Sequence, residues 1–241
     1  MRQLQEKEIA VLEQQGCTAE DWRKVLVSND FKPQHVRRVD FYGNVEMGEL
    51  RTDVEITEGF SKHSGIRNAV LRNVRIGNNC LIENVSNYIS HYEIGPETCI
   101  ENVDLMYVDG ECRFGNGVAV SVMNETGGRE VYIHERLSAQ VAYVVTMYRH
   151  RPHLVACLNR MAEEYAEARK SRTGRIGSHV TIRNTRCIDG VCIGDCAVVS
   201  GASRLRNGTV VSNAAAPVCI GHGVIADDFI ISSGSSVEDN T

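Results

Sequence analysis

Two of the chain's eight histidines lie in segments whose polar neighbours could orient an imidazole for proton transfer. His63 is part of Phe60-Ser61-Lys62-His63-Ser64-Gly65, and His91 is part of Asn87-Tyr88-Ile89-Ser90-His91-Tyr92. Because an imidazole titrates near neutral pH, it is well suited to take a proton from a hydroxyl or an amine as a general base. We rank His63 first and His91 second as catalytic candidates. The alternative for each is an ordinary surface histidine.

A polar segment at residues 122–129, Val-Met-Asn-Glu-Thr-Gly-Gly-Arg, indicates a binding loop. Loops that interrupt a regular scaffold commonly carry binding groups, so we expect substrate contacts from Asn124, Glu125 and Arg129. Glu125 would orient a sugar hydroxyl, and Arg129 would meet a phosphate. Arg204 is a weaker candidate for contact with an anion. The alternative for the whole segment is a simple turn into the next element.

The nine cysteines indicate neither a disulfide framework nor a metal site. Their number is odd, no CxxC pair occurs, and their spacing matches no zinc-ligand pattern. We therefore expect free, mostly packed thiols and no bound metal.

The clearest regularity is a repeat, which must be considered before individual elements because a fixed period determines the architecture. An Ile-Gly pair, followed after two further residues by a small or β-branched one, begins at Ile76, Ile94, Ile176, Ile193 and Ile220. Aliphatic residues recur at steps of six between such pairs. The first two pairs are 18 residues apart, or three hexapeptides, so equivalent residues would stack if three short strands formed one coil.

Asparagine recurs at one position after an aliphatic residue, at Asn73, Asn84, Asn102, Asn184 and Asn207. Gly and Asn tolerate the positive φ that a sharp corner often requires. Stacked asparagines can also hydrogen-bond from one coil to the next. A structural role for these residues is therefore favoured over a ligand-binding one.

These repeats resemble those of the hexapeptide-repeat superfamily, over residues 36–134 and 174–241. The resemblance implies a left-handed parallel β-helix that assembles as a trimer, whereas the period alone implies only a parallel solenoid. It also implies an acyl-coenzyme A-dependent transferase. Coenzyme A or acetyl-coenzyme A would then be a co-substrate, with no tightly bound cofactor. Uncharacterised bacterial transferase-like proteins have similar segments.

Two segments depart from the repeat and predict helices. The first thirty residues indicate two helices, the second with Thr18 as N-cap and Asp21 at the capping-box position, which would cover one end of the solenoid. Residues 135–173 carry apolar residues at helical spacing with a break at Pro152, which predicts a helical hairpin.

The expected fold class is therefore mainly β: a left-handed parallel β-helix of hexapeptide repeats with N-terminal helices and a helical hairpin insertion. Four parts are predicted: an N-terminal helical cap (1–35), a first part of the β-helix (36–134), the helical insertion (135–173) and a second part of the β-helix (174–241).

Composition narrows the classes of partner. With a formal net charge of -5 and a pI of about 5.9, the chain has no basic patch suited to nucleic acid or anionic lipid. No apolar run approaches the roughly 18 residues that cross a bilayer, and no signal peptide is recognisable. We expect a cytoplasmic homo-oligomer acting on a small molecule.

Two functions remain in competition. The first is an acyltransferase that acts on a sugar or nucleotide-sugar. The second is a non-catalytic β-helix scaffold, or an accessory domain of a sugar nucleotidyltransferase-like protein. The carbonic anhydrase branch of the same superfamily is disfavoured, because its three zinc-binding histidines have no counterpart among His63, His91, His179 and His222.

Overall fold

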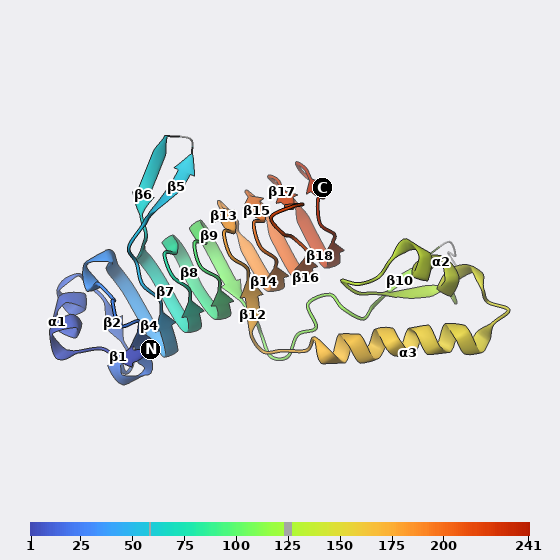
Figure 1. Ribbon diagram of the computed structural model, residues 1–241, viewed down its shortest axis with the longest axis horizontal. Coiled ribbons are helices and arrows are strands. Elements are labelled where there is room, and N and C mark those ends of the chain that lie inside the picture. Colours follow the sequence, from blue (N-terminus) through green and yellow to red (C-terminus); the bar gives the residue numbers. More distant parts are fainter. Residues whose placement is uncertain (58, 123–126) are drawn as a thin grey trace.

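Most of the chain is built from parallel strands stacked on one another, and two segments project from them (Figure 1). The structure is a computed structural model that describes residues 1–57, 59–122 and 127–241. We call the strands between residues 18–47, 65–107 and 174–237 the stack, residues 53–63 the β5–β6 hairpin, and residues 108–173 the arm.

In chain order the elements are β1 (Arg2–Gln3), α1 (Glu6–Gln14), β2 (Thr18–Ala19), the 3-10 helix η1 (Trp22–Lys24), β3 (Val25–Val27), the 3-10 helix η2 (Pro33–His35), β4 (Val36–Met47), β5 (Asp53–Thr57), β6 (Phe60–His63), β7 (Gly65–Ile76), β8 (Leu81–Ile94), β9 (Cys99–Tyr107), β10 (Val118–Ser121), β11 (Glu130–Ile133), α2 (Ala139–Met147), α3 (Pro152–Ala168), β12 (Gly174–Ile176), β13 (Thr181–Arg183), β14 (Cys187–Ile193), β15 (Val198–Ser200), β16 (Arg204–Val210), β17 (Cys219–Ile220), β18 (Ile225–Ile231) and β19 (Ser236–Val237).

The Ile-Gly pairs determine the register of the stack. Ile76 pairs with Ile94 in the parallel ladder of β7 and β8, and Ile94 pairs with Ile176 at the start of β12. Ile176 in turn pairs with Ile193. The chain leaves the stack at the end of β9 and, after the arm, resumes as β12 in register with β8. The arm is thus inserted without a loss of register.

The predicted left-handed β-helix made of three short strands per coil is wrong. The structure is mainly β, with 46% strand and 17% helix, and its parallel strands include a closed ring of four. In this ring β8 pairs with β12, β12 with β14, β14 with β9, and β9 with β8. The hexapeptide period misled because β7 and β8 continue through their positive-φ asparagines as strands of 12 and 14 residues.

The prediction of two N-terminal helices is also wrong for the second helix. Helix α1 is present, but Val25–Val27 forms β3, which pairs in parallel with Val45–Met47 of β4. Val25 and Val27 are buried there, as expected of β-branched side chains on a sheet. Thr18 is in a strand, and Asp21 is the residue that caps, because its carboxylate accepts a hydrogen bond from Arg23 N–H at the start of η1.

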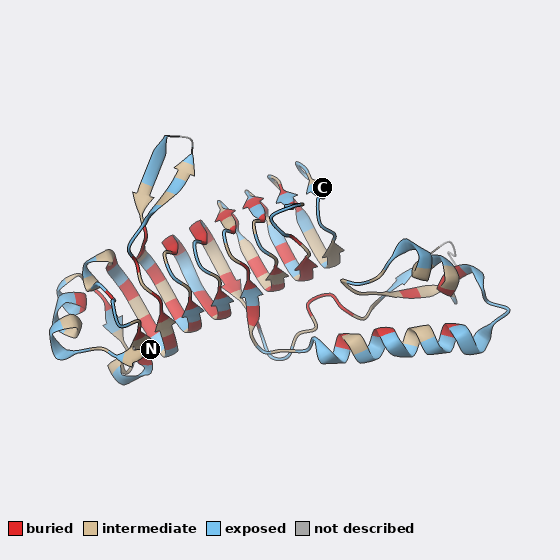
Figure 2. Cartoon of the chain, viewed as in Figure 1, coloured by how far each residue is buried: buried red, intermediate tan, exposed pale blue. Residues whose placement is uncertain are grey.

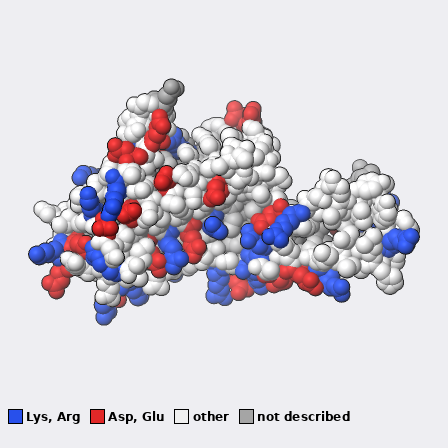
Figure 3. All heavy atoms as spheres, viewed as in Figure 1, with Lys and Arg blue, Asp and Glu red and all other residues white. Residues whose placement is uncertain are grey.

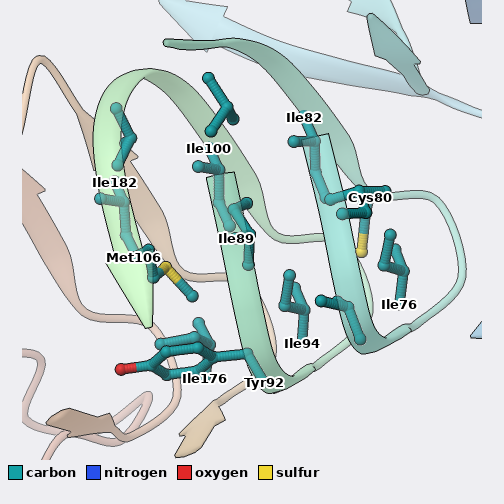
Figure 4. Packing of buried hydrophobic residues seen from close by; sticks show 14 of the residues in the cluster. Ile76, Cys80, Ile82, Ile89, Tyr92, Ile94, Ile100, Met106, Ile176 and Ile182 are labelled. Carbon is teal, nitrogen blue, oxygen red and sulfur yellow. The ribbon is translucent and has the colours of Figure 1, made fainter. Parts of the chain in front are cut away.

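Inward side chains of successive strands form one continuous apolar core (Figures 2 and 4). Tyr92 lies wholly inside this core, where its Oη donates to Val191 O at 3.1 Å and accepts from Val191 N–H at 3.2 Å. A buried hydroxyl costs little when it is hydrogen-bonded in this way. Gly174 makes room for the ring, since a Cβ there would lie 2.4 Å from Tyr92 Cε1.

The asparagines line the corners of the stack. Asn68, Asn84, Asn102 and Asn184 have positive φ, and each amide donates to the next at 2.9 to 3.2 Å. Such a ladder satisfies polar side chains at the corners and holds successive strands in register.

The arm extends away from the stack and has an apolar cluster of its own (Figure 1). The antiparallel pair β10–β11 packs with α2 and α3 around Val131, Val145 and Val155. Helix α2 is N-capped by Ser138, and α3 begins at Pro152, a residue favoured in the first helical turn. Among the described helices, none combines the length and apolar character needed to cross a membrane.

Candidate functional site

The strongest arrangement of chemically active side chains lies at the base of the β5–β6 hairpin, which leaves the stack between β4 and β7 (Figure 1). Antiparallel pairing sets Asp53 directly opposite His63. His63 Nδ1 lies 2.9 Å from Asp53 Oδ1, which is hydrogen-bond distance. The His63 side chain retains 31% of its exposure, so solvent and small molecules can reach it.

A second imidazole faces the other nitrogen of His63. His35, at the end of η2, brings its Nε2 to 3.2 Å from His63 Nε2. An ionised carboxylate only accepts hydrogen bonds, so Asp53 requires a proton on His63 Nδ1 and leaves Nε2 of the neutral ring as an acceptor. Burial, and then electrostatic interaction with His63 and Arg67, lower the pKa of His35. A neutral His35 can donate from Nε2 to His63.

The hairpin is tied to the stack by an ion network. Lys62 Nζ lies 2.7 Å from both Glu83 Oε2 and Glu101 Oε1. These carboxylates pair across β8 and β9 and lie between Arg67 and Arg183, each of which forms an ion pair with its neighbouring glutamate. The hydrogen bonds that Lys62 donates to Glu101, then to Glu83, raise the pKa of Lys62.

Two opposing effects act on the pKa of Glu83. Burial favours its neutral form, but the hydrogen bonds from Lys62 and Arg67 outweigh it and hold the pKa of this carboxyl below its ordinary value. Glu83 therefore stays ionised at neutral pH and helps to fix Lys62, the residue that precedes His63.

A cavity of about 240 Å³ opens beside Asp53, between the hairpin and the corner that contains Glu97 and His179. Glu97 and His179 face each other at 3.2 Å. Cys99 also lines this cavity, but burial raises the pKa of its thiol to about 11. Since the thiolate is the nucleophilic form, Cys99 is unsuited to nucleophilic attack at neutral pH.

His91, the second candidate, lies at a corner of the stack with a positive φ of 58°. Both ring nitrogens have partners, Ser90 Oγ at 2.7 Å from Nδ1 and Asn73 Nδ2 at 3.0 Å from Nε2. Burial lowers the pKa of His91. These contacts give the imidazole a role in holding the corner, and its catalytic role stays a prediction.

The predicted binding residues do not gather around His63. Arg129 lies in the arm, just before β11, and Arg204 lies on β16, where it forms a 2.7 Å ion pair with Asp227. The hairpin and the arm are far apart in Figure 1, so one chain does not bring Arg129 to His63. Asn124 and Glu125 lie outside the described residues.

Sequence reasoning missed Asp53, His35 and Lys62. The usable signal for Asp53 was the stretch from residue 53 to residue 63, in which a glycine, Gly59, separates two short segments with alternating polarity. Such a stretch predicts a hairpin and would have set Asp53 against His63. No local signal points to His35, because it reaches His63 only through the pairing of β4 with β7.

We also searched the described part of the chain for disulfides and metal sites. All nine cysteines are free, and no described group of three or more His, Cys, Asp or Glu side chains is arranged to hold a metal ion.

Comparison with known proteins shows where this chain belongs. An uncharacterized protein of Treponema pallidum (strain Nichols) is 30% identical over 247 residues, an alignment that covers 98% of this chain and 34% of the relative. The chain thus spans about a third of the length of that relative. A family model matches residues 1–241, and the chain belongs to that family, described as a domain of unknown function (DUF4954).

Proposed function

We propose that the chain transfers an acyl group from a coenzyme A thioester to a hydroxyl or amine of a sugar or nucleotide-sugar, with His63 as the general base. The observation that carries the proposal is the contact between His63 Nδ1 and Asp53. A carboxylate in this position fixes the tautomer and orientation of the ring and stabilises the imidazolium that forms during catalysis. Asp53 also lines a cavity of about 240 Å³, which His63 itself does not line.

The reaction needs one proton to be moved twice. His63 Nε2 takes the proton of the acceptor hydroxyl or amine as its oxygen or nitrogen attacks the thioester carbonyl carbon. The tetrahedral intermediate then collapses, the carbon–sulfur bond breaks, and the coenzyme A thiolate leaves and receives the proton from the imidazolium. For this step the acceptor replaces His35 as the partner of Nε2.

The same proposal includes the setting in which the enzyme works. We place it in the cytoplasm as a homo-oligomer, with a trimer as the expected state. Coenzyme A or acetyl-coenzyme A is the exchangeable co-substrate.

The test combines binding and turnover. Coenzyme A and acetyl-coenzyme A are titrated calorimetrically into protein whose oligomeric state has been fixed by light scattering. Free coenzyme A is then quantified by mass spectrometry with sugars, amino sugars and nucleotide-sugars as acceptors. His63→Asn should lower the turnover number by about 10² to 10⁴ because the base is lost. Asp53→Asn should lower it while leaving donor binding intact.

His222→Asn is the matched control, because His222 is an exposed corner histidine. Its turnover should equal that of the wild type. Turnover that survives in His63→Asn would refute the assignment of the base.

A non-catalytic scaffold or accessory domain is the second candidate, and one observation favours it. The helices of the arm expose large apolar side chains, among them Tyr143 and Met161 at 58% each and Met147 at 43%. Exposed apolar groups of this size are typical of surfaces that bind another protein. A stable oligomer that neither binds nor consumes acetyl-coenzyme A would favour this function.

A further inference from the structure

Helix α3 has two different apolar faces. One consists of the residues that are buried within the arm, Val155, Ala162 and Ala166. The other is an exposed stripe made of Leu154, Cys157 and Met161. Their spacing of three and four residues places these side chains on one side of the helix, because an α-helix has 3.6 residues per turn. Met161 is 58% exposed and Leu154 is 43% exposed, so most of the stripe is in contact with solvent.

The stripe is accessible to another molecule. The arm extends away from the stack, and α3 runs along one side of it, with much of its surface exposed (Figures 1 and 2). The buried face of α3 packs toward β11 and α2, so the stripe points away from the arm's own apolar cluster. Apolar residues at alternating steps of three and four are typical of a helix that packs against another helix.

The charges along α3 have an order that a second copy can match. Figure 3 shows acidic side chains on the part of α3 near the stack and basic ones at the tip of the arm. The acidic group is Glu163, Glu164 and Glu167, and Arg149 and Arg151 lie just before the helix. An identical helix that runs in the opposite direction would set the basic end of each copy beside the acidic half of the other. Such complementarity favours association and fixes its register.

Glu164 and Arg151 are available for this contact. Glu163 and Glu167 already form ion pairs within the arm. Glu164 is 71% exposed and lies 3.8 Å from Arg160 of its own helix, and such exposed pairs are weak. The exposed guanidinium of Arg151 has no ion pair or hydrogen bond with the part of the chain that the structure describes.

We propose that α3 forms a contact between two copies of this chain, in which the two helices pack antiparallel through Leu154, Cys157 and Met161. Centred near Cys157, this arrangement sets Leu154 against the partner's Met161 and Arg151 beside the partner's Glu164. By two-fold symmetry each contact occurs twice, and the two Cys157 side chains lie close to the axis. The contact is separate from the proposed acyl-transfer site and does not depend on acyl transfer.

The test uses the native cysteines of the full chain. Cys157 and Cys219 are the two exposed cysteines, and only Cys157 lies on α3. A short bismaleimide should yield a covalent dimer, in which peptide mass spectrometry identifies a link between the two Cys157 residues. Cys157→Ser should abolish this dimer, whereas Cys219→Ser should leave its yield unchanged.

A substitution on the stripe separates a specific contact from random collision. At protein concentrations where the dimer is the minor species, Met161→Glu should lower the yield of the cross-linked dimer by about tenfold or more, because a carboxylate would be buried against apolar groups. Val120→Glu is the matched control, since Val120 is an exposed apolar residue of the arm that lies on β10. Its yield should equal that of the wild type, and circular dichroism confirms that both variants are folded.

Charge reversal tests the direction of the two helices. Arg151→Glu and Glu164→Arg should each lower the yield about fivefold, because like charges would then face each other. The double variant should restore the yield, since the pair forms again with its charges exchanged. Three outcomes would overturn the proposal: no link between the two Cys157 residues, a yield that Met161→Glu does not change, or a double variant that is no better than the single ones.

Discussion

The β5–β6 hairpin and the arm both interrupt the stack, but the arm adds an apolar cluster of its own to ion pairs such as Arg169–Glu135. The hairpin is fixed at its base by charged groups, above all Lys62 between Glu83 and Glu101. The arm has its own apolar cluster around Val131, Val145 and Val155. Electrostatic attachment depends on pH and salt, whereas apolar packing depends on shape and volume. The two projections should therefore respond to different perturbations.

The largest effect is expected for the ion network. Glu83→Ala removes one of the two carboxylate partners of Lys62 and the carboxylate that pairs with Arg67, in a largely buried position. Removal of one member of a buried pair costs about 3 to 5 kcal/mol, and the partial exposure of Lys62 places this variant near the lower limit. Urea denaturation measures the loss, and hydrogen exchange should show the hairpin opening first.

Asp227→Asn provides the comparison for that variant, because it weakens ion pairs that Asp227 makes with the exposed Arg204 and Arg206. Its cost should stay below about 1 kcal/mol. Equal losses in the two variants would show that the network beneath the hairpin is no stronger than a surface pair.

A somewhat smaller effect is expected in the arm. Val131→Ala removes two methyl groups from a side chain that is only 3% exposed and should cost about 2 kcal/mol. Because the arm's cluster is separate from the core of the stack, faster hydrogen exchange should be confined to β10, β11, α2 and α3. Faster exchange that extended into β8 or β14 would show that the arm and the stack unfold together.

The stability of the hairpin's attachment should depend on pH more strongly than that of the arm's apolar cluster. The pKa of Glu83 is lowered in the folded chain, so its contribution is present above its ordinary value of 4.5 and is lost as the pH falls through the lower folded value. The pKa of Lys62 is raised, so its contribution is present below 10.5 and is lost as the pH rises through the higher folded value. Proteolysis of the hairpin should accelerate at both extremes.

The arm serves as the internal control in the same experiment. His134 and the ion pairs of Glu135 and Glu163 lie elsewhere in the arm, so the control is limited to the apolar cluster, whose side chains carry no titratable group. Hydrogen exchange of the cluster residues should change less over the same pH range. An equal response of both regions would argue against an electrostatic attachment specific to the hairpin.

Features of the fold that the repeat determines could be predicted from the sequence, whereas contacts that depend on long-range pairing could not. The stacking of Ile76, Ile94 and Ile176 was foreseeable because a repeat written in the sequence determines the register. The contact between His63 and Asp53 required a local hairpin to be recognised, and His35 required long-range pairing. The second N-terminal helix was predicted wrongly because the pairing of Val25–Val27 with β4 overrides a local helical pattern.

The smallest effect is expected at the tip of the hairpin. Gly59 has a φ of 77°, and a Cβ added there would meet nothing within 4 Å. Gly59→Ala should therefore cost only the strain of a left-handed alanine, about 1 kcal/mol, and Gly59→Asn less, since Asn tolerates this conformation. Because a Cβ at Gly59 meets no neighbouring atom, the strain should speed hydrogen exchange in β5 and β6 and leave the melting temperature of the stack unchanged. A fall in that melting temperature would mean that the tip is coupled to the stack, and the hairpin would then not be a projection held at its base alone.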